Sequence, residues 1–215
     1  MAAMLVLAAC GCGPTRFDQL LESAQSDDLD RQRAALRELA DLGPEAAPAV
    51  PYLIQLSGHP HPDIRRLSGL ALGNLASGQV TADMPSQRGE IRDVLLRQLD
   101  DKDLAVRNTA AFALLDLDPD QASAQRQLQR AIQQGDGGLI DRLTHLDPKP
   151  AWAVPTLIDI VKRDRRPGLR RLAVVALGEI DPSRVDAQQA LKTALEDPND
   201  QVRSAAGAAL RRAPP

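Results

Sequence analysis

The feature that most constrains this chain is an arginine that recurs in a fixed pattern of small and aliphatic residues. Each copy follows an aliphatic residue, precedes a small residue by three positions, and precedes a leucine by seven. These offsets lie on one face of an α-helix. The four copies are Arg65, Arg107, Arg170 and Arg203. The chain is therefore expected to repeat one helical unit, and we call the arginine position the frame residue.

Two further units fit the same pattern with a different frame residue, Gln32 in one and Asp136 in the other. The six frame residues are 33, 42, 29, 34 and 33 positions apart, which is the length of a helix–turn–helix unit. Five of them are followed twelve positions later by a proline, and Asp118, Asp147 and Asp181 directly precede three of those prolines. An Asp-Pro pair there is expected to end one helix and to cap the next.

The composition fits helices with an aliphatic core. Hydrophobic residues make up 43% of the chain, charged residues 26%, and aromatic residues only 2%. The 29 acidic residues outnumber the 26 basic ones, which disfavours a nucleic-acid binder. No apolar run approaches the roughly 18 residues that a membrane-spanning helix needs.

The repeat resembles HEAT-like repeats, the type also found in phycobilisome lyases. Residues 197–203 match the Asp-Pro-x-x-x-Val-Arg turn of that family, and the resemblance covers residues 15–215. It implies an all-α fold, a single α-solenoid (α-α superhelix) of about six helical hairpins. It also implies that the frame arginine links one hairpin to the next through a carboxylate. Asp101 and Asp164 occupy the same first position as Asp197, and His59 replaces this aspartate in the second unit.

Six residues are expected to face solvent on the concave side of such a solenoid and to bind a partner. They lie one or nine positions after a frame residue, and they are Arg66, Asn74, Asn108, Asp116, Arg171 and Glu179. Because they carry both signs of charge, they predict a surface for a polypeptide rather than a phosphate groove.

Two other features indicate binding without identifying the partner. The 42-residue spacing places an inserted loop around residues 76–85, and insertions in solenoids commonly lie on an edge where partners dock. The last helical segment is rich in alanine and stops at Pro214 and Pro215 without a polar cap. This end is expected to meet another protein or a second copy of the chain.

No motif for catalysis or for a cofactor is found, and we expect neither an enzyme nor a resident metal. The pair His59 and His61 next to Asp63 fits a capped loop better than a metal site. The paired His-Glu dipeptides that hold iron in HEAT-type deoxyhypusine hydroxylases do not occur. The basic run at residues 162–166 is expected to be a solvated turn, with an anionic lipid or an acidic partner as the alternative.

Residues 1–14 are interpreted as a separate segment with a signal and a short tether. Leu7-Ala8-Ala9-Cys10 resembles the bacterial lipobox, which implies cleavage before Cys10 and a lipid on its sulfur. Gly11 follows in place of the aspartate that resembles an inner-membrane retention signal, which favours the outer membrane of the cell envelope. No Lys or Arg precedes Arg16, so an unprocessed apolar tail in a cytoplasmic protein is the alternative.

Taken together, these features predict a non-catalytic protein-binding scaffold tethered to a membrane through Cys10. The alternative is a cytoplasmic HEAT-like accessory or regulatory subunit. A third hypothesis, a HEAT-like enzyme acting on a nucleobase or a bilin, would need an aromatic-lined pocket with an acid, and the sequence does not supply one.

Overall fold

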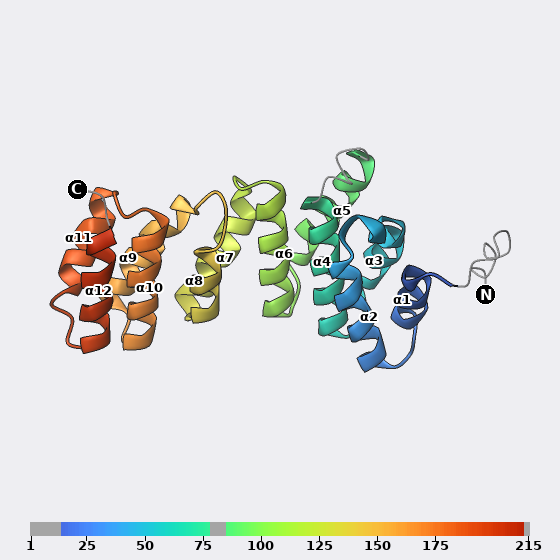
Figure 1. Ribbon diagram of the computed structural model, residues 1–215, viewed down its shortest axis with the longest axis horizontal. Coiled ribbons are helices and arrows are strands. Elements are labelled where there is room, and N and C mark those ends of the chain that lie inside the picture. The colour runs from blue at the N-terminus through green and yellow to red at the C-terminus, as the bar shows by residue number, and fades with distance from the viewer. Residues whose placement is uncertain (1–13, 78–84, 213–215) are drawn as a thin grey trace. The chain divides into compact units, whose positions relative to one another are not determined.

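The computed structural model of the chain describes residues 14–77 and 85–212, and all regular structure in these ranges is helical (Figure 1). The α-helices pair into six hairpins, which confirms the predicted α-solenoid fold. Their bounds are α1 (Arg16–Ala24), α2 (Leu29–Asp41), α3 (Val50–Leu56), α4 (Pro62–Ser77), α5 (Pro85–Gln98), α6 (Leu104–Leu117), α7 (Ala122–Gln134), α8 (Gly137–Leu143), α9 (Val154–Arg163), α10 (Pro167–Ile180), α11 (Val185–Ala194) and α12 (Asp200–Arg212). Two short 3-10 segments, Gly43–Ala49 and Ala151–Ala153, lead into α3 and α9.

The hairpins form two compact units, Met1–Leu117 and Asp118–Pro215. In the first unit, α4 packs against both α2 and α6, so the second helices of the three hairpins lie side by side (Figure 1). In the second unit, α10 packs in the same way against α8 and α12. Every frame residue except Asp136 lies on one of these second helices, and Asp136 caps the start of α8.

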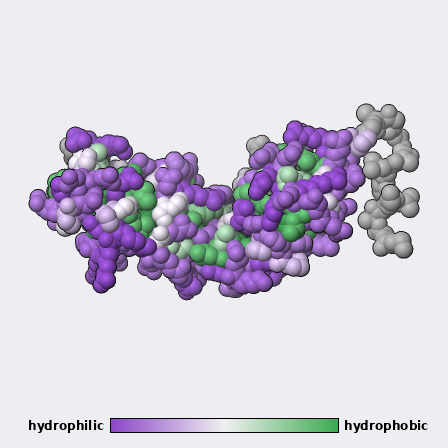
Figure 2. All heavy atoms as spheres, turned by 90° about the horizontal axis from the view of Figure 1, so that it is seen from below, coloured by the Kyte–Doolittle hydropathy of each residue, from purple (hydrophilic) through white to green (hydrophobic). Residues whose placement is uncertain are grey.

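The leucine and the small residue of the repeat pattern form the core, as predicted. Leu72, Leu114 and Leu177 are at most 1% exposed, whereas Leu210 in the last helix is partly exposed. The small residues of the same four helices are completely buried, and they are Ser68, Ala110, Ala173 and Ala206. On the face shown in Figure 2, hydrophilic residues cover most of the surface, with smaller hydrophobic areas between them.

Local capping explains several helix boundaries. The Asp28 carboxylate accepts hydrogen bonds from the backbone N–H groups of Asp30 and Arg31 at the start of α2. The Asp136 carboxylate accepts one from Leu139 at the start of α8. At the end of α7, Gly135 takes the left-handed conformation, with a φ of 100°, that stops a helix. These caps satisfy backbone groups that a helix terminus would otherwise leave unpaired.

Two of the three Asp-Pro pairs directly follow the end of a second helix, at Leu117 and at Ile180, as predicted, whereas α8 already ends at Leu143, several residues before Asp147. The expectation that the pairs cap the following helices is wrong. α7 begins at Ala122 and α11 at Val185, both several residues beyond their Asp-Pro pair. The Asp118 carboxylate instead accepts a hydrogen bond from the N–H of Asp120, 3.1 Å away, and so closes a turn. Because this aspartate is used within the turn, the next helix starts later.

The second helices approach each other closely at a glycine eight positions after the frame residue. A Cβ atom on Gly73 of α4 would lie 2.5 Å from the Cβ of Ala113 on α6. A Cβ atom on Gly178 of α10 would lie 2.7 Å from the Cβ of Ala209 on α12. Distances this short force the packing to shift, so the repeat requires a glycine facing an alanine at both junctions.

We predict that Gly178→Ala lowers the free energy of unfolding by about 1–3 kcal/mol, because the added methyl group overpacks the α10–α12 contact. The matched control is Gly168→Ala in the same helix, where an added Cβ would meet no atom within 4 Å. Alanine has the higher helix propensity, so the control should keep or slightly raise stability. Urea denaturation of both variants measures the difference, and equal stabilities would contradict the close packing.

Candidate functional site

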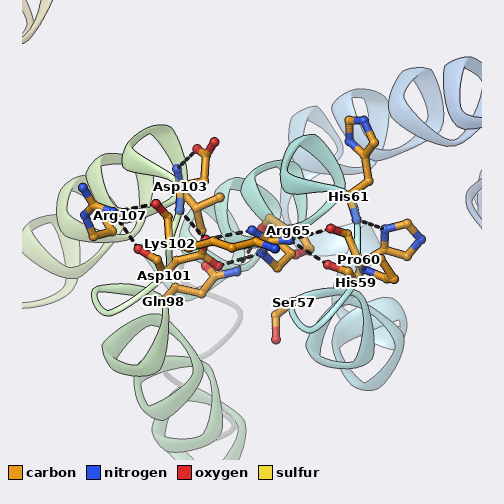
Figure 3. A network of polar contacts seen from close by, with 12 residues as sticks. Ser57, His59, Pro60, His61, Arg65, Gln98, Asp101, Lys102, Asp103 and Arg107 are labelled. Atoms are coloured by element: carbon orange, nitrogen blue, oxygen red, sulfur yellow. Dashed lines mark hydrogen bonds and ion pairs between the residues drawn. The ribbon is translucent and has the colours of Figure 1, made fainter.

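The site is built on the second helices and on the turns that join them to the first helices of their hairpins. At two junctions the frame arginine forms an ion pair with an aspartate in the turn of the following hairpin. Arg65 on α4 donates from Nε to Oδ2 of Asp101 at 2.6 Å and from Nη2 to Oδ1 at 2.8 Å (Figure 3). Arg170 on α10 binds Asp197 in the same way, at 2.7 and 2.8 Å. We call this two-pronged ion pair the interhairpin clip, and it confirms the link that the resemblance implied.

The clip is largely buried and strongly hydrogen-bonded. The Arg65 side chain is 8% exposed and that of Asp101 12%, and the second clip is similarly enclosed. The hydrogen bonds from Arg65 are the main reason that the pKa of Asp101 lies below its usual value. Arg170 lowers the pKa of Asp197 in the same way. Both carboxylates also accept a backbone N–H bond from the residue two positions on, which fixes the turn.

The first junction lacks both partners of the clip and replaces them. Gln32 stands at the frame position and His59 at the aspartate position. The next residue of α2, Arg33, binds the Asp63 carboxylate at 2.8 Å, and its Nη2 lies 3.2 Å from Nε2 of His61. The ionic link between the first two hairpins has therefore moved one residue along α2.

The histidines in this turn act as local acceptors. The His59 Nδ1 lies 3.0 Å from the backbone N of His61, and the His61 Nδ1 lies 3.2 Å from the backbone N of Asp63. Pro62 begins α4, in agreement with the predicted capped loop. Within the described residues, no group of three potential metal ligands is found.

The junction between the fourth and fifth hairpins also has a substitute. The frame residue there is Asp136, so no frame arginine is available for Asp164. Arg166, from the same turn as Asp164, binds its carboxylate through Nε at 3.0 Å and Nη2 at 2.8 Å. The guanidinium lies against Gly135, where a Cβ would come within 1.8 Å of Nη1. Arg166 thus binds Asp164 although it is exposed, as Lys162, Arg163 and Arg165 also are.

Five of the six predicted partner-binding residues are at least partly exposed. Asn74, Asp116 and Glu179 are exposed, and Arg66 and Arg171 are half-exposed. The prediction that Asn108 faces solvent is wrong, because it is only 7% exposed. It shares a helix face with Phe112, four positions on, which is 1% exposed. At these two positions α6 is buried, whereas the corresponding positions of α4 and α10 are half-exposed, and Asp116 at the end of the same face is exposed.

The open faces of α4 and α10 have the same chemical order. Each begins with an arginine one position after the frame residue, continues with a half-exposed aliphatic residue, and ends with a polar residue nine positions after the frame residue. On α4 these residues are Arg66, Leu70 and Asn74, and on α10 they are Arg171, Val175 and Glu179. Because the three positions are four residues apart, they form a continuous stripe, which we call the second-helix stripe.

The last residue of the stripe on each helix also contacts a neighbouring second helix, and the sequence did not predict these contacts. The Asn74 amide donates a hydrogen bond to the backbone carbonyl of Ala40 in α2 at 3.0 Å. Glu179 lies 3.6 Å from Arg212 in α12. These contacts fix the ends of the stripe with respect to the adjacent second helix.

Three parts of the predicted site lie outside the described residues. They are Cys10 with the lipobox-like segment, residues 78–84 of the 76–85 insertion, and the terminal Pro214 and Pro215. No helix in the described ranges combines the length and the apolar character that crossing a bilayer requires.

The repeated hairpins define an α-solenoid, and comparison with known proteins agrees with this class. Residues 139–211 match the family model described as HEAT repeats. An engineered protein of known structure is 21% identical, with 92% of this chain and 98% of that chain covered and a TM-score of 0.51. This structural similarity supports the same repeat fold. Among curated proteins, none matches the chain.

Two other solved structures align over most of the chain. A designed armadillo repeat protein in complex with the peptide (KR)4 is 20% identical, with 93% of this chain and 100% of that chain covered and a TM-score of 0.47. Human deoxyhypusine hydroxylase in complex with glycerol is 19% identical, with 91% and 83% covered and a TM-score of 0.42.

We predict that Asp197→Asn removes a pH-dependent part of the stability. Because the folded-state pKa of Asp197 is lowered, the clip stabilises the fold above the unfolded pKa of about 3.9 and loses this effect as the pH falls through the folded pKa. At pH 6 the variant should unfold about 3 kcal/mol more easily than the wild type. This difference should shrink steadily as the pH falls from 4 towards 2.

The control for this prediction is Asp186→Asn, because Asp186 pairs with Arg184 at the surface. Surface pairs contribute little, so the control should follow the wild-type curve. Chemical denaturation at a series of pH values gives the comparison. A constant difference between Asp197→Asn and the wild type across that range would contradict the linkage.

Proposed function

We propose that this protein is a non-catalytic scaffold that binds another protein through its second-helix stripe. The observation that carries the proposal is that two neighbouring sets of arginines differ in their contacts. The side chains of the frame arginines Arg65 and Arg170 are largely buried in the ion pairs of the clips. The residues directly after them, Arg66 and Arg171, remain open to solvent.

The chemistry of the stripe suits a polypeptide. A guanidinium at one end can pair with a carboxylate, and the half-exposed Leu70 and Val175 offer an apolar contact in the middle. An asparagine or a glutamate at the other end can pair with backbone amides or with a basic side chain. A nucleic-acid groove would instead need basic residues along its whole length.

We also propose that the scaffold is held at the outer membrane of a bacterial cell through a lipid on Cys10. The residues Leu7-Ala8-Ala9-Cys10 support this proposal by their resemblance to a lipobox. Two or more acyl chains would bind a bilayer far more tightly than a single chain. A cytoplasmic accessory or regulatory subunit with an unprocessed N-terminus is the competing proposal.

The binding proposal predicts that a phage-displayed library of random dodecapeptides panned on the full chain yields ligands. Arg66→Glu or Arg171→Glu should weaken the selected peptides about tenfold or more by fluorescence anisotropy, which corresponds to about 1.4 kcal/mol. Arg92→Glu on the exposed side of α5 is the matched control and should bind as the wild type does. Failure to select any peptide, or equal binding by all variants, would contradict the proposal.

The anchoring proposal predicts that Cys10 carries the lipid. In a Gram-negative host fed radiolabelled fatty acid, the wild type and Cys12→Ser should be labelled and should sediment with membranes, whereas Cys10→Ser should not. The mass of the N-terminal peptide gives an independent readout. An unlabelled wild-type protein in the soluble fraction would support the cytoplasmic alternative instead.

A further inference from the structure

We propose that Arg107 is a preformed binding site for a carboxylate of the partner protein, so this inference rests on the proposed scaffold function. The four frame arginines share one backbone contact. Each donates from Nη1 to the carbonyl oxygen six residues earlier. The distances are 2.9 Å for Arg65, 2.7 Å for Arg107, 2.9 Å for Arg170 and 2.7 Å for Arg203. The same bond therefore orients all four guanidinium groups.

The four arginines differ at the other edge of the guanidinium, formed by Nε and Nη2. In Arg65 and Arg170 this edge holds the carboxylate of an aspartate with two hydrogen bonds. In Arg203 the Nη2 atom binds Asp200 of the same helix. Within the described residues of its own unit, Arg107 contacts only two backbone carbonyls, those of Asp101 and Lys102, and both bonds come from Nη1 (Figure 3).

The sequence explains why Arg107 has no clip partner of the usual kind. The position six residues before the frame residue holds an aspartate in three hairpins, at Asp101, Asp164 and Asp197, and the first and last of these form clips. In the fourth hairpin this position is Arg130, and the turn between α7 and α8 is only Gly135 and Asp136. The repeat therefore does not encode an aspartate for Arg107.

The nearest acid in sequence is also occupied. Asp103 lies four residues before Arg107, but its Oδ1 accepts hydrogen bonds from the N–H groups of Ala105 and Val106 at the start of α6. Arg107 itself is half-exposed, whereas Arg65 is 6% exposed. The Nε–Nη2 edge is thus oriented by the same backbone bond as the edges that bind aspartate elsewhere in this chain, and Arg107 as a whole is less buried than Arg65.

The chemistry of this edge selects a planar acid. Two parallel N–H donors match the two oxygens of a carboxylate, and the backbone bonds from Nη1 reduce the side-chain entropy that binding would otherwise cost. The two clips show which group fits this edge. In each clip the partner is an aspartate on a turn, and its carboxylate also accepts a hydrogen bond from the backbone N–H of the residue two positions later. We therefore assign the ligand as an aspartate of a partner protein presented on such a turn.

A peptide that copies residues 195–202 of the chain, acetylated and amidated at its ends, is the probe, because it contains the Asp197 turn. We expect it to shift the Arg107 Nε–Hε signal of the intact ¹⁵N-labelled protein in a saturable way, and to leave those of Arg65 and Arg170 in place. The same peptide with Asp197→Asn should bind at least fivefold more weakly. An unmoved Arg107 signal at millimolar peptide, or equal effects of both peptides, would overturn the proposal. A shift caused by inorganic phosphate but not by the peptide would also overturn it.

A variant in the protein gives a second readout. Arg107→Lys keeps the charge but loses the two-pronged edge, so it should weaken the peptide at least fivefold. Arg66→Lys is the matched control and should not change binding of this peptide. Because Arg107 also donates to two backbone carbonyls, the melting temperatures of the variants and the wild type are compared to detect a loss of stability. The peptide with Asp197→Asn tests the site in the wild-type protein.

The outcomes separate this inference from the proposed function. Library-selected peptides that depend on Arg66, combined with an Arg107 signal that the aspartate peptide does not move, would support the scaffold and overturn the Arg107 site. A saturable Arg107 shift with no peptide selected from the library would support the carboxylate site and contradict the scaffold function.

Discussion

The structure depends on how each hairpin is joined to the next, because a single helix pair cannot bury its apolar face alone. Two contacts make the junction. Leucines and small residues of the second helices fill the core, and at two junctions a frame arginine also reaches from one hairpin into the turn of the next. A buried arginine with an aspartate satisfying its two-pronged edge is specific in distance and direction, so it fixes the register in which the hydrophobic faces meet.

Two departures from the repeat also contain an arginine–aspartate pair, one between hairpins and one within a turn. Where the frame residue is Gln32, the link is made by Arg33 and Asp63, and where it is Asp136, Arg166 binds the unclaimed Asp164. In both cases an arginine–aspartate pair persists although the repeating position has lost its arginine. This persistence supports a structural role for the pairs, and we propose the neighbouring second-helix stripe as the surface for recognition.

The periodic part of the fold could be predicted from the sequence, because the spacing of small and aliphatic residues within one helix determines which face is buried. The resemblance to HEAT-like repeats implied a linking role for the frame arginines, which holds for Arg65 and Arg170 but not for Arg107, whose hydrogen bonds within the described residues of its unit go to backbone carbonyls of its own turn. The substitutes Arg33 and Arg166 could not be predicted, because each lies outside the repeating position and meets its partner only through the geometry of the turns. The prediction for Asn108 was wrong because its place in the helical repeat indicates an outward side chain, whereas the structure buries both Asn108 and Phe112 on that face.

The central claim is that the frame arginine and the turn aspartate act together across the hairpin junction. A double-mutant cycle on Arg65→Leu and Asp101→Asn, followed by urea denaturation, measures this coupling directly. The account predicts an interaction energy of about 2 kcal/mol, with the double variant much less destabilised than the sum of the single variants. Additive effects, with a coupling near zero, would contradict it.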